Sequence, residues 1–293
     1  MRRLLLLIPI LLGLAAAPAA ALEVVATSPS MGALVRTVAP DAKLTVLAGP
    51  DRDLHRLQAK PSMIRALRSA DLVVAIGAEL EIGWLPPAIA SAANRSIQPG
   101  QPGYFEAAAQ VPLLDVGGPA DRALGDVHPV GNPHVDLDPV RMATIAATLA
   151  ERFVRLDPGD ASRYQSNAAA FGAQVDERMA VWQRRVGEAP RGVVPYHRDA
   201  IYLLERLGVP LLGTIEAVPG VPPSGRHLQE LVSQLSGREG VIIYAPYHSP
   251  KAPRRLAERL GWSAVELPLE PPLGSDGGGY LEHIGRWVEA IAE

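Results

Sequence analysis

The chain has 293 residues, contains no cysteine and carries a formal net charge of −3 at pH 7. The lack of cysteine excludes disulfides, thiolate catalysis, cysteine-based zinc sites and a lipid anchor on an N-terminal cysteine. The weak negative charge gives no reason to expect nucleic acid or an anionic membrane surface as a partner.

The N-terminus predicts secretion. Arg2 and Arg3 form a positive region, residues 4–14 are largely apolar, and the three alanines at 19–21 offer a cleavage site. The apolar run is shorter than the ~20 residues that a membrane-spanning helix needs. We therefore expect a cleaved signal peptide over residues 1–21. Because no lipid anchor can hold the mature chain, we expect it in the periplasm of a cell with two membranes.

Strands alternate with helices in the first part of the mature chain. The hydrophobic pattern predicts strands at 22–27, 43–47 and 71–77, and helices at 31–38 and 61–69. This alternation is typical of parallel βα units. Residues 98–137 are rich in Pro, Gly and Asp and predict a long loop, with one strand at 111–115.

The middle of the chain is predicted to be helical. Helical spacing holds from 140 to 156, stops at 157–160 and resumes from 161 to 186. The second segment would be ~39 Å long at 1.5 Å per residue. A helix of that length can link two lobes, and an ordinary surface helix is the alternative interpretation.

The βα alternation returns after this helix. Strands are predicted at 192–195, 210–214, 240–244 and 264–267, and helices at 199–207, 224–235, 250–260 and 280–292. The sequence thus predicts an α/β fold of two doubly wound βα lobes joined by a long linking helix. The predicted domains are an N-terminal lobe over 22–159, the linking helix over 160–187 and a C-terminal lobe over 188–293. Ligands are expected between the lobes, at the carboxyl ends of strands.

Three of the seven histidines lie where such a fold places its ligand contacts. His55 follows the second strand, His134 directly precedes the helical segment, and His197 directly follows the strand at 192–195. Neutral imidazole is the commonest metal ligand, and three imidazoles suit Zn²⁺, with a carboxylate to complete a tetrahedron. Their spacing alone is a weak signal, because the three are far apart in the chain.

The motifs around these histidines resemble those of the zinc/manganese class of ABC-transporter solute-binding proteins, known as cluster A-I. The resemblance rests on the Gly49-Pro50 turn before His55, the Asn-Pro-His-Val-x-Leu-Asp-Pro motif over 132–139, and the helix start after His197. Asp136 stands where the family usually has an aromatic residue. The resemblance implies two βα lobes joined by one rigid helix, with a single metal between them, and it implies His55, His134 and His197 as ligands.

The same resemblance leaves the fourth ligand open. Many members place an Asp after the last strand, and Glu270 is its nearest counterpart here. Glu216 corresponds to the Glu of manganese-type members, Asp276 lies close behind Glu270, and water is a further alternative. Glu216 and Asp276 are also candidates for groups that hold the histidines in place.

The remaining histidines are predicted to lie outside the metal site. His128, in a short segment where many zinc members carry a His- and Asp-rich loop, is predicted to be solvated, with accessory metal binding as the alternative. His227 and His283 have charged neighbours and predict solvated helix faces. His248 follows the strand at 240–244, and we keep a position beside the site as its alternative.

The sequence therefore predicts a periplasmic binding component of an ABC importer that captures Zn²⁺ and delivers it to the membrane permease. A periplasmic metallochaperone is a further candidate partner, and we expect a monomer that binds no nucleic acid. No H-E-x-x-H, G-x-S-x-G or phosphate-loop motif occurs, which argues against an enzyme. The alternatives are an Mn²⁺- or Fe²⁺-binding member of the same class, a siderophore- or vitamin-binding protein, and a zinc hydrolase.

Overall fold

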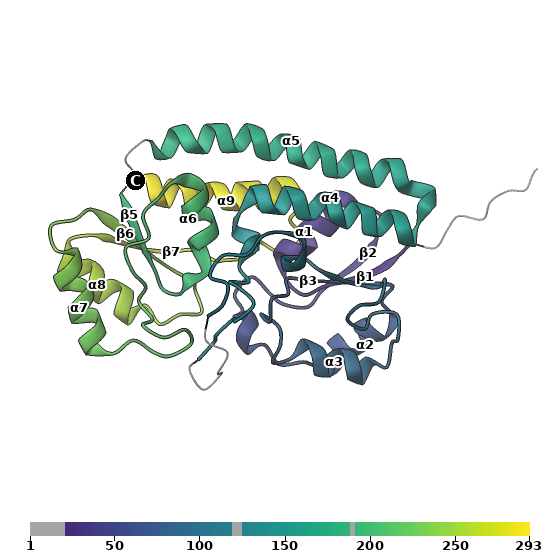
Figure 1. Ribbon diagram of the computed structural model, residues 1–293, viewed down its shortest axis with the longest axis horizontal. Helices are drawn as coiled ribbons and strands as arrows, with labels where there is room; N and C mark the ends of the chain where they lie inside the picture. Colours follow the sequence, from purple (N-terminus) through teal and green to yellow (C-terminus); the bar gives the residue numbers. More distant parts are fainter. Residues whose placement is uncertain (1–20, 119–124, 188–190) are drawn as a thin grey trace, which may run out of the picture.

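The computed structural model describes residues 21–118, 125–187 and 191–293, and over these residues the chain folds into two parallel sheets covered by helices (Figure 1). The first sheet has the strand order β2-β1-β3-β4 and the second has the order β5-β6-β7. The strands are β1 (Glu23–Ala26), β2 (Lys43–Val46), β3 (Leu72–Ala75), β4 (Tyr104–Glu106), β5 (Gly192–Pro195), β6 (Gly240–Tyr244) and β7 (Ser263–Glu266).

Helices connect consecutive strands within each sheet, as parallel pairing requires. The helices are α1 (Pro29–Val38), α2 (Pro61–Ser69), α3 (Leu85–Ala92), α4 (Pro139–Leu156), α5 (Ala161–Val186), α6 (Ile201–Leu207), α7 (Gly225–Leu235), α8 (Lys251–Leu260) and α9 (Gly277–Ala292). Short helical turns that matter for the site are η1 (Leu54–Arg56), η4 (Val135–Leu137) and η6 (Arg198–Ala200). Within the described ranges, every helix is too short or too polar to cross a bilayer.

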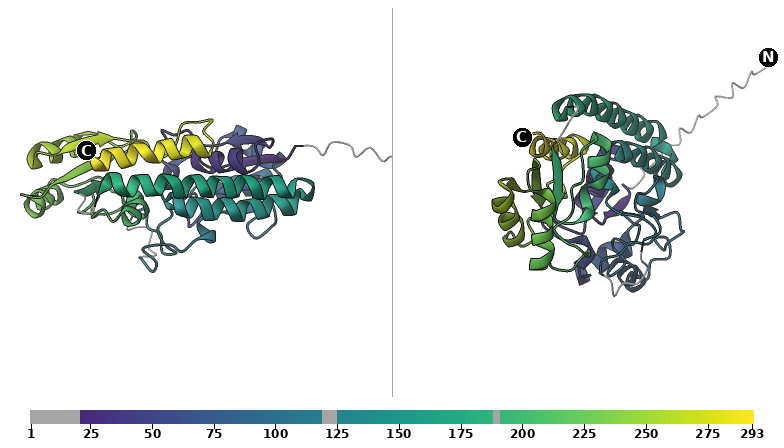
Figure 2. Two further views of the ribbon diagram at one scale, coloured as in Figure 1. Left: turned by 90° about the horizontal axis from the view of Figure 1, so that it is seen from above. Right: turned by 60° about the vertical axis from the view of Figure 1, so that its left-hand side comes forward.

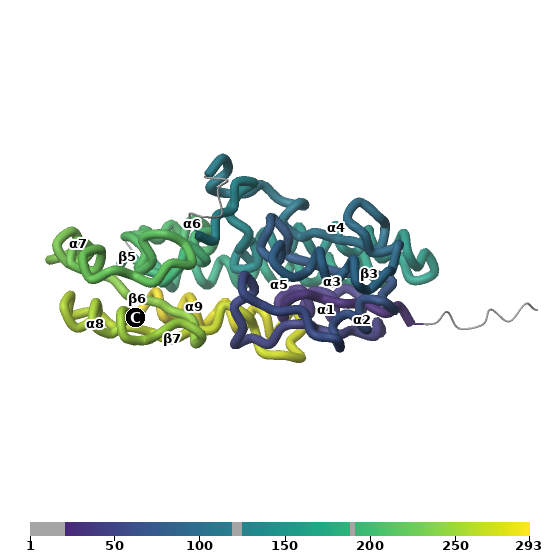
Figure 3. The backbone as a smooth tube through the Cα atoms, turned by 90° about the horizontal axis from the view of Figure 1, so that it is seen from below, coloured from purple at the N-terminus to yellow at the C-terminus, as the bar shows by residue number. Residues whose placement is uncertain are grey.

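Both faces of each sheet are buried, because successive side chains of a strand point to opposite sides. In the first sheet, Val24 packs into a core with α1 and α4, whereas Val25 packs into a second core with α2 and α3. In the second sheet, Val193 shares a core with α6 and α9, and Val194 shares another with α7 and α8. The predicted α/β fold of two doubly wound lobes is confirmed, and Figure 3 shows α7 and α8 at the left end and α2 and α3 in the right-hand half.

Helix α5 links the two lobes, as predicted. It packs against α1 and α4 of the first lobe and against α6 and α9 of the second, and Figure 2 shows it running alongside α4 and α9. Its buried face includes Phe171 and Trp182. One hydrophobic core joins these helices to both sheets, so the lobes are held together over a wide area. The lobe boundaries at 159 and 188 stay predictions.

The strand predicted at 111–115 is wrong, and the first sheet is completed instead by β4 at Tyr104–Glu106. Pro112 has no N–H to donate to a strand ladder. The backbone of Leu114 is hydrogen-bonded outside the sheet. Its N–H donates to the Tyr202 hydroxyl at 3.0 Å, and its carbonyl accepts from the Asn132 N–H at 2.8 Å. Residues 111–115 therefore form a loop.

The strand predicted at 210–214 is reduced to a single bridge between Leu211 and Val193. The Val193 N–H donates to the Pro210 carbonyl, and the Leu212 N–H donates to the Val193 carbonyl. Gly213, at φ +149°, then turns the chain away. The bridge lies on the far side of β5 from β6, so the second sheet repeats the strand arrangement of the first in a shortened form.

Candidate metal centre

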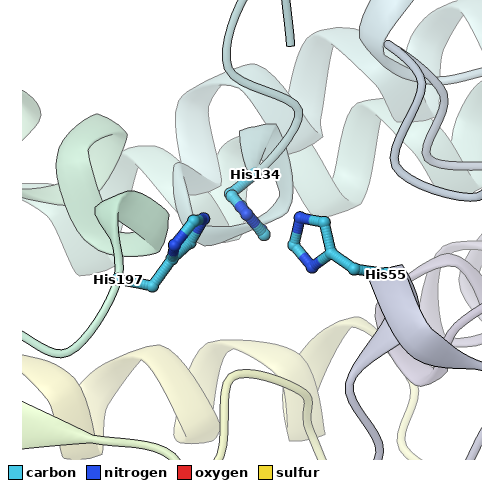
Figure 4. Close-up of side chains that lie close together, drawn as sticks. All are labelled: His55, His134 and His197. Carbon is cyan, nitrogen blue, oxygen red and sulfur yellow. The ribbon is translucent and has the colours of Figure 1, made fainter. Parts of the chain in front are cut away.

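The three predicted histidines meet at the cleft between the lobes. His55 lies in η1 after β2, His134 directly precedes η4, and His197 lies between β5 and η6. One ring nitrogen from each lies within 4.8 Å of the other two. The ring centroids are 5.3 Å apart for His55 and His134, and 5.5 Å apart for the other two pairs (Figure 4). The fold thus brings together three imidazoles that are distant in sequence.

Asp53 fixes the orientation of the His55 ring. Its Oδ1 accepts from the backbone N–H of His55 at 3.0 Å and lies 2.9 Å from the ring Nδ1. Burial alone would raise the pKa of Asp53, but the hydrogen bond and charge of His55 outweigh it and the pKa is lowered. An ionised carboxylate can only accept, so Nδ1 carries the proton and the lone pair of Nε2 is available to a metal.

Glu216 fixes the orientation of the His197 ring. Both residues belong to the second lobe, whereas Asp53 and His55 belong to the first. Glu216 Oε2 lies 3.1 Å from His197 Nδ1 and accepts from the backbone N–H of Gly220 at 3.0 Å. A carboxylate that accepts from a ligating imidazole sets the tautomer and raises the basicity of the other ring nitrogen. Glu216 therefore matches the prediction of a group that holds a histidine in place.

Asn132 positions His134. Its side-chain oxygen accepts from the His134 N–H at 3.0 Å, and its amide donates to the Arg198 carbonyl at 2.8 Å. One side chain thus ties the loop of His134 to the loop of His197, which is a physical reason for the asparagine of the Asn-Pro-His motif.

His134 carries the strongest indication of a metal ligand. The ring is buried, and its Nε2 has no hydrogen-bond partner among the described residues. Burial, followed by the charges of His55, His197 and His128, lowers the pKa of His134 well below its usual value. Buried polar atoms almost always have a partner. A neutral imidazole with an unsatisfied nitrogen beside two others is the arrangement that a cation satisfies.

The three histidines lie at a cleft of about 270 Å³ that is lined by residues of both lobes. His248 lines this cleft, with its ring stacked on Tyr196 at a centroid distance of 3.8 Å. His248 is thus a neighbour of the site, which was the alternative that the sequence left open for it. Burial is the main reason why the pKa of His248 is lowered to about 4, so at neutral pH this ring adds no positive charge to the cleft.

Glu270 lies near the histidines but outside the group of three. It lines a cavity of about 20 Å³ together with His55 and His134. Its Oε2 accepts from the Ser30 N–H at 2.7 Å, and the Ser30 hydroxyl donates to Asp136 at 2.9 Å. Burial and repulsion from Asp136 raise the pKa of Glu270 well above its usual range, and burial raises that of Asp136 to about 6. Coordination by Glu270 stays a prediction.

Asp276 has a structural role away from the histidines. It is exposed, and its side chain accepts from the Gly279 N–H at 3.0 Å as the N-cap of α9.

Two histidines lie elsewhere than predicted. His283 is buried, at 1% exposure, with Nε2 2.9 Å from the Leu269 carbonyl, so its predicted solvated face is wrong. His128 is half-buried, and its Nε2 lies 3.1 Å from the Nε2 of His55. This contact places His128 beside the site, and accessory metal binding by His128 stays a prediction. Residues 119–124 of its loop lie outside the described residues.

Solved structures share this architecture. The chain is similar to a zinc-bound deletion mutant of ZnuA, with a TM-score of 0.75 and 21% identity over 93% of this chain and 99% of the other. It is also similar to the binding protein FpvC from Pseudomonas aeruginosa in complex with Mn²⁺, with a TM-score of 0.77 and 23% identity over 92% of this chain and 96% of the other. These likenesses establish the fold.

Sequence comparison adds the family. The chain is 24% identical over 277 residues to the high-affinity zinc uptake system protein ZnuA of Yersinia pestis, covering 87% of this chain and 84% of that protein. It is 26% identical over 323 aligned residues to the ZnuA of Paracoccus denitrificans, covering 96% and 92%. The family model described as ZnuA, the periplasmic component A of the zinc-uptake complex, matches residues 24–293. The chain belongs to this family, and it is a binding component of a metal transport system and not an enzyme.

Proposed function

We propose that this chain binds one Zn²⁺ through His55, His134 and His197 and delivers it to the membrane permease of an ABC importer. The observation that carries the proposal is the buried Nε2 of His134, which lacks a partner among the described residues and faces a group of ring nitrogens that lie within 4.8 Å of one another. A divalent cation at that point would accept the lone pairs of all three rings.

The donor set supports Zn²⁺ as the cargo. Imidazole suits Zn²⁺, whereas Mn²⁺ prefers carboxylate, carbonyl and water oxygens. The carboxylate of Glu216, which would serve a manganese site, is engaged by His197 and Gly220. The relatives named as zinc-uptake proteins support the same choice. Binding of Mn²⁺ or Fe²⁺ is the alternative, and the Mn²⁺ complex of FpvC shows that a protein of this fold can hold that ion.

Capture requires no large movement of the lobes. The core shared by α1, α5 and α9 holds them together, so the response to metal falls mainly on the loops that carry the histidines. Release to the permease then requires the permease to disturb these loops.

We further propose that the chain acts as a monomer in the periplasm, after removal of a signal peptide at residues 1–21. Residues 1–20 lie outside the described residues.

The test is zinc content and affinity of the mature chain, residues 22–293. We expect about one zinc per chain by elemental analysis, and loss of that zinc in His134→Ala. The matched control is His227→Gln, which alters a histidine on α7 and keeps a donor for the Thr214 carbonyl. A wild type without zinc, or a His134→Ala variant that retains full occupancy, contradicts the proposal.

A further inference from the structure

We propose that His128 supplies a fourth ligand to the cation held by His55, His134 and His197. This inference rests on the proposed function, since it concerns the same cation. The observation behind it is the contact between two ring nitrogens: the Nε2 atoms of His55 and His128 lie 3.1 Å apart. Their rings are 5.2 Å apart at the centroids and are tilted by 46°, so they meet edge to edge and do not stack.

The separation of the two nitrogens is close to that of two ligands on one zinc. Zinc–nitrogen bonds of 2.0–2.1 Å at tetrahedral angles place the nitrogens about 3.3–3.4 Å apart. Because Nδ1 of His55 donates to Asp53, the lone pair on its Nε2 points toward His128. His128 thus lies on the side of His55 where a cation would bind.

Without the metal, the same contact is an N–H···N hydrogen bond in which His128 donates. Coordination then requires the His128 proton to move from Nε2 to Nδ1 through exchange with water. This tautomer change leaves the charge of the ring unaltered and frees the Nε2 lone pair.

We expect metal binding to draw the four rings toward one point. The ring nitrogens of the three central histidines lie within 4.8 Å of one another, and around zinc we expect separations of roughly 3.4 Å. His128 lies outside that group of three and joins it by the same contraction. Its segment is held to neighbouring loops on both sides of His128: the Asp126 N–H donates to the Pro219 carbonyl, and the Gly117 N–H donates to the Pro129 carbonyl.

The charges around the site favour a neutral fourth ligand over Glu270. Asp53 and Glu216 already place two carboxylates behind the ligating rings, which offsets the two positive charges of the cation. One oxygen of Glu270, Oε2, already accepts from the Ser30 backbone N–H, so this carboxylate is partly engaged away from the histidines. Four nitrogen donors would also disfavour Mn²⁺ relative to Zn²⁺.

X-ray absorption at the zinc edge tests this assignment by counting the imidazoles around the metal. We expect four in the wild type, three in His128→Ala and four in Glu270→Gln, the matched variant for the rival ligand. We also expect His128→Ala to bind zinc at least about 10-fold more weakly, by the scale of losses seen around metal sites.

Equal imidazole counts in the wild type and His128→Ala would overturn the assignment. A wild type that holds zinc with three imidazoles overturns this proposal alone, whereas a wild type that takes up no zinc overturns the proposed function as well. His128→Gln repeats the measurement with a side chain of similar length.

Discussion

The carboxylate of Glu216 offers a sharp test of how the site is organised. Glu216→Ala removes the acceptor for His197 Nδ1 at 3.1 Å and for the Gly220 N–H at 3.0 Å. The His197 ring then loses its fixed tautomer, and the cation loses one nearby negative charge. Loss of such an outer partner typically weakens metal binding 10- to 100-fold, or about 1.4–2.7 kcal/mol. Zinc content should stay near one per chain, because all three histidines remain.

The assay is competition for zinc against a chromophoric chelator at fixed pH and ionic strength. Glu216→Gln keeps an acceptor for His197 but removes the charge, so its loss of affinity should be smaller. Asp53→Ala should weaken binding similarly through His55, whereas Asp276→Ala, which removes the cap of α9, should leave affinity unchanged. Wild-type affinity in Glu216→Ala would refute the positioning role, and complete loss of zinc would instead indicate a direct ligand.

Two further predictions concern the stability of the metal-free protein. Burial lowers the pKa of His283 to about 4, so between pH 6.5 and 4 the unfolded chain binds a proton that the folded chain does not, and stability falls as pH falls. Between pH 7 and pH 5 the free energy of unfolding should fall by about 2 kcal/mol for this reason. In urea unfolding, His283→Gln should lose correspondingly less stability over the same pH range. Equal losses in the two proteins would contradict this. Gly277→Ala would place a Cβ 2.6 Å from the Phe171 ring and should cost about 1–3 kcal/mol. The control is Gly172→Ala on α5, where an added Cβ would meet nothing within 4 Å. It should stabilise the folded protein by up to about 1 kcal/mol. Similar effects of the two changes would be inconsistent with this packing.

Much of the fold could be predicted because its long elements have strong local signals. Helix α5 begins and ends where Asp157-Pro158-Gly159-Asp160 and Gly187 interrupt the helical pattern. The buried strands β3 and β6 are continuous apolar runs, as parallel strands covered on both faces should be. Helix α3 is not among the predicted elements. Its first turn contains Pro86 and Pro87, which a helix tolerates at that position.

The elements that were wrongly predicted depend on contacts that local sequence does not carry. Strand β4 is three residues long and lies directly after Pro102-Gly103, so it has no clear pattern of its own. His283 was placed on a solvated face because of Glu282 and Arg286. Helical geometry instead aligns it with Tyr280 and Trp287, three and four residues away, and both are buried.

The metal site could likewise be predicted only in part. His55, His134 and His197 could be proposed because each is positioned by its place at a strand end or helix start and by a recognisable motif. The supporting contacts could not be predicted in detail, since they join segments that are far apart in sequence. The contact between His55 and His128, which are 73 residues apart, depends on the path of a loop rich in Pro and Gly.

The central claim is that three imidazoles from separate segments bind one cation, and a crystal structure of the zinc-loaded protein tests it most directly. Anomalous scattering at the zinc edge should show one strong site, about 2.0–2.1 Å from a ring nitrogen of each of His55, His134 and His197. A zinc site elsewhere in the cleft, or any of these three rings turned away from the metal, would contradict the account.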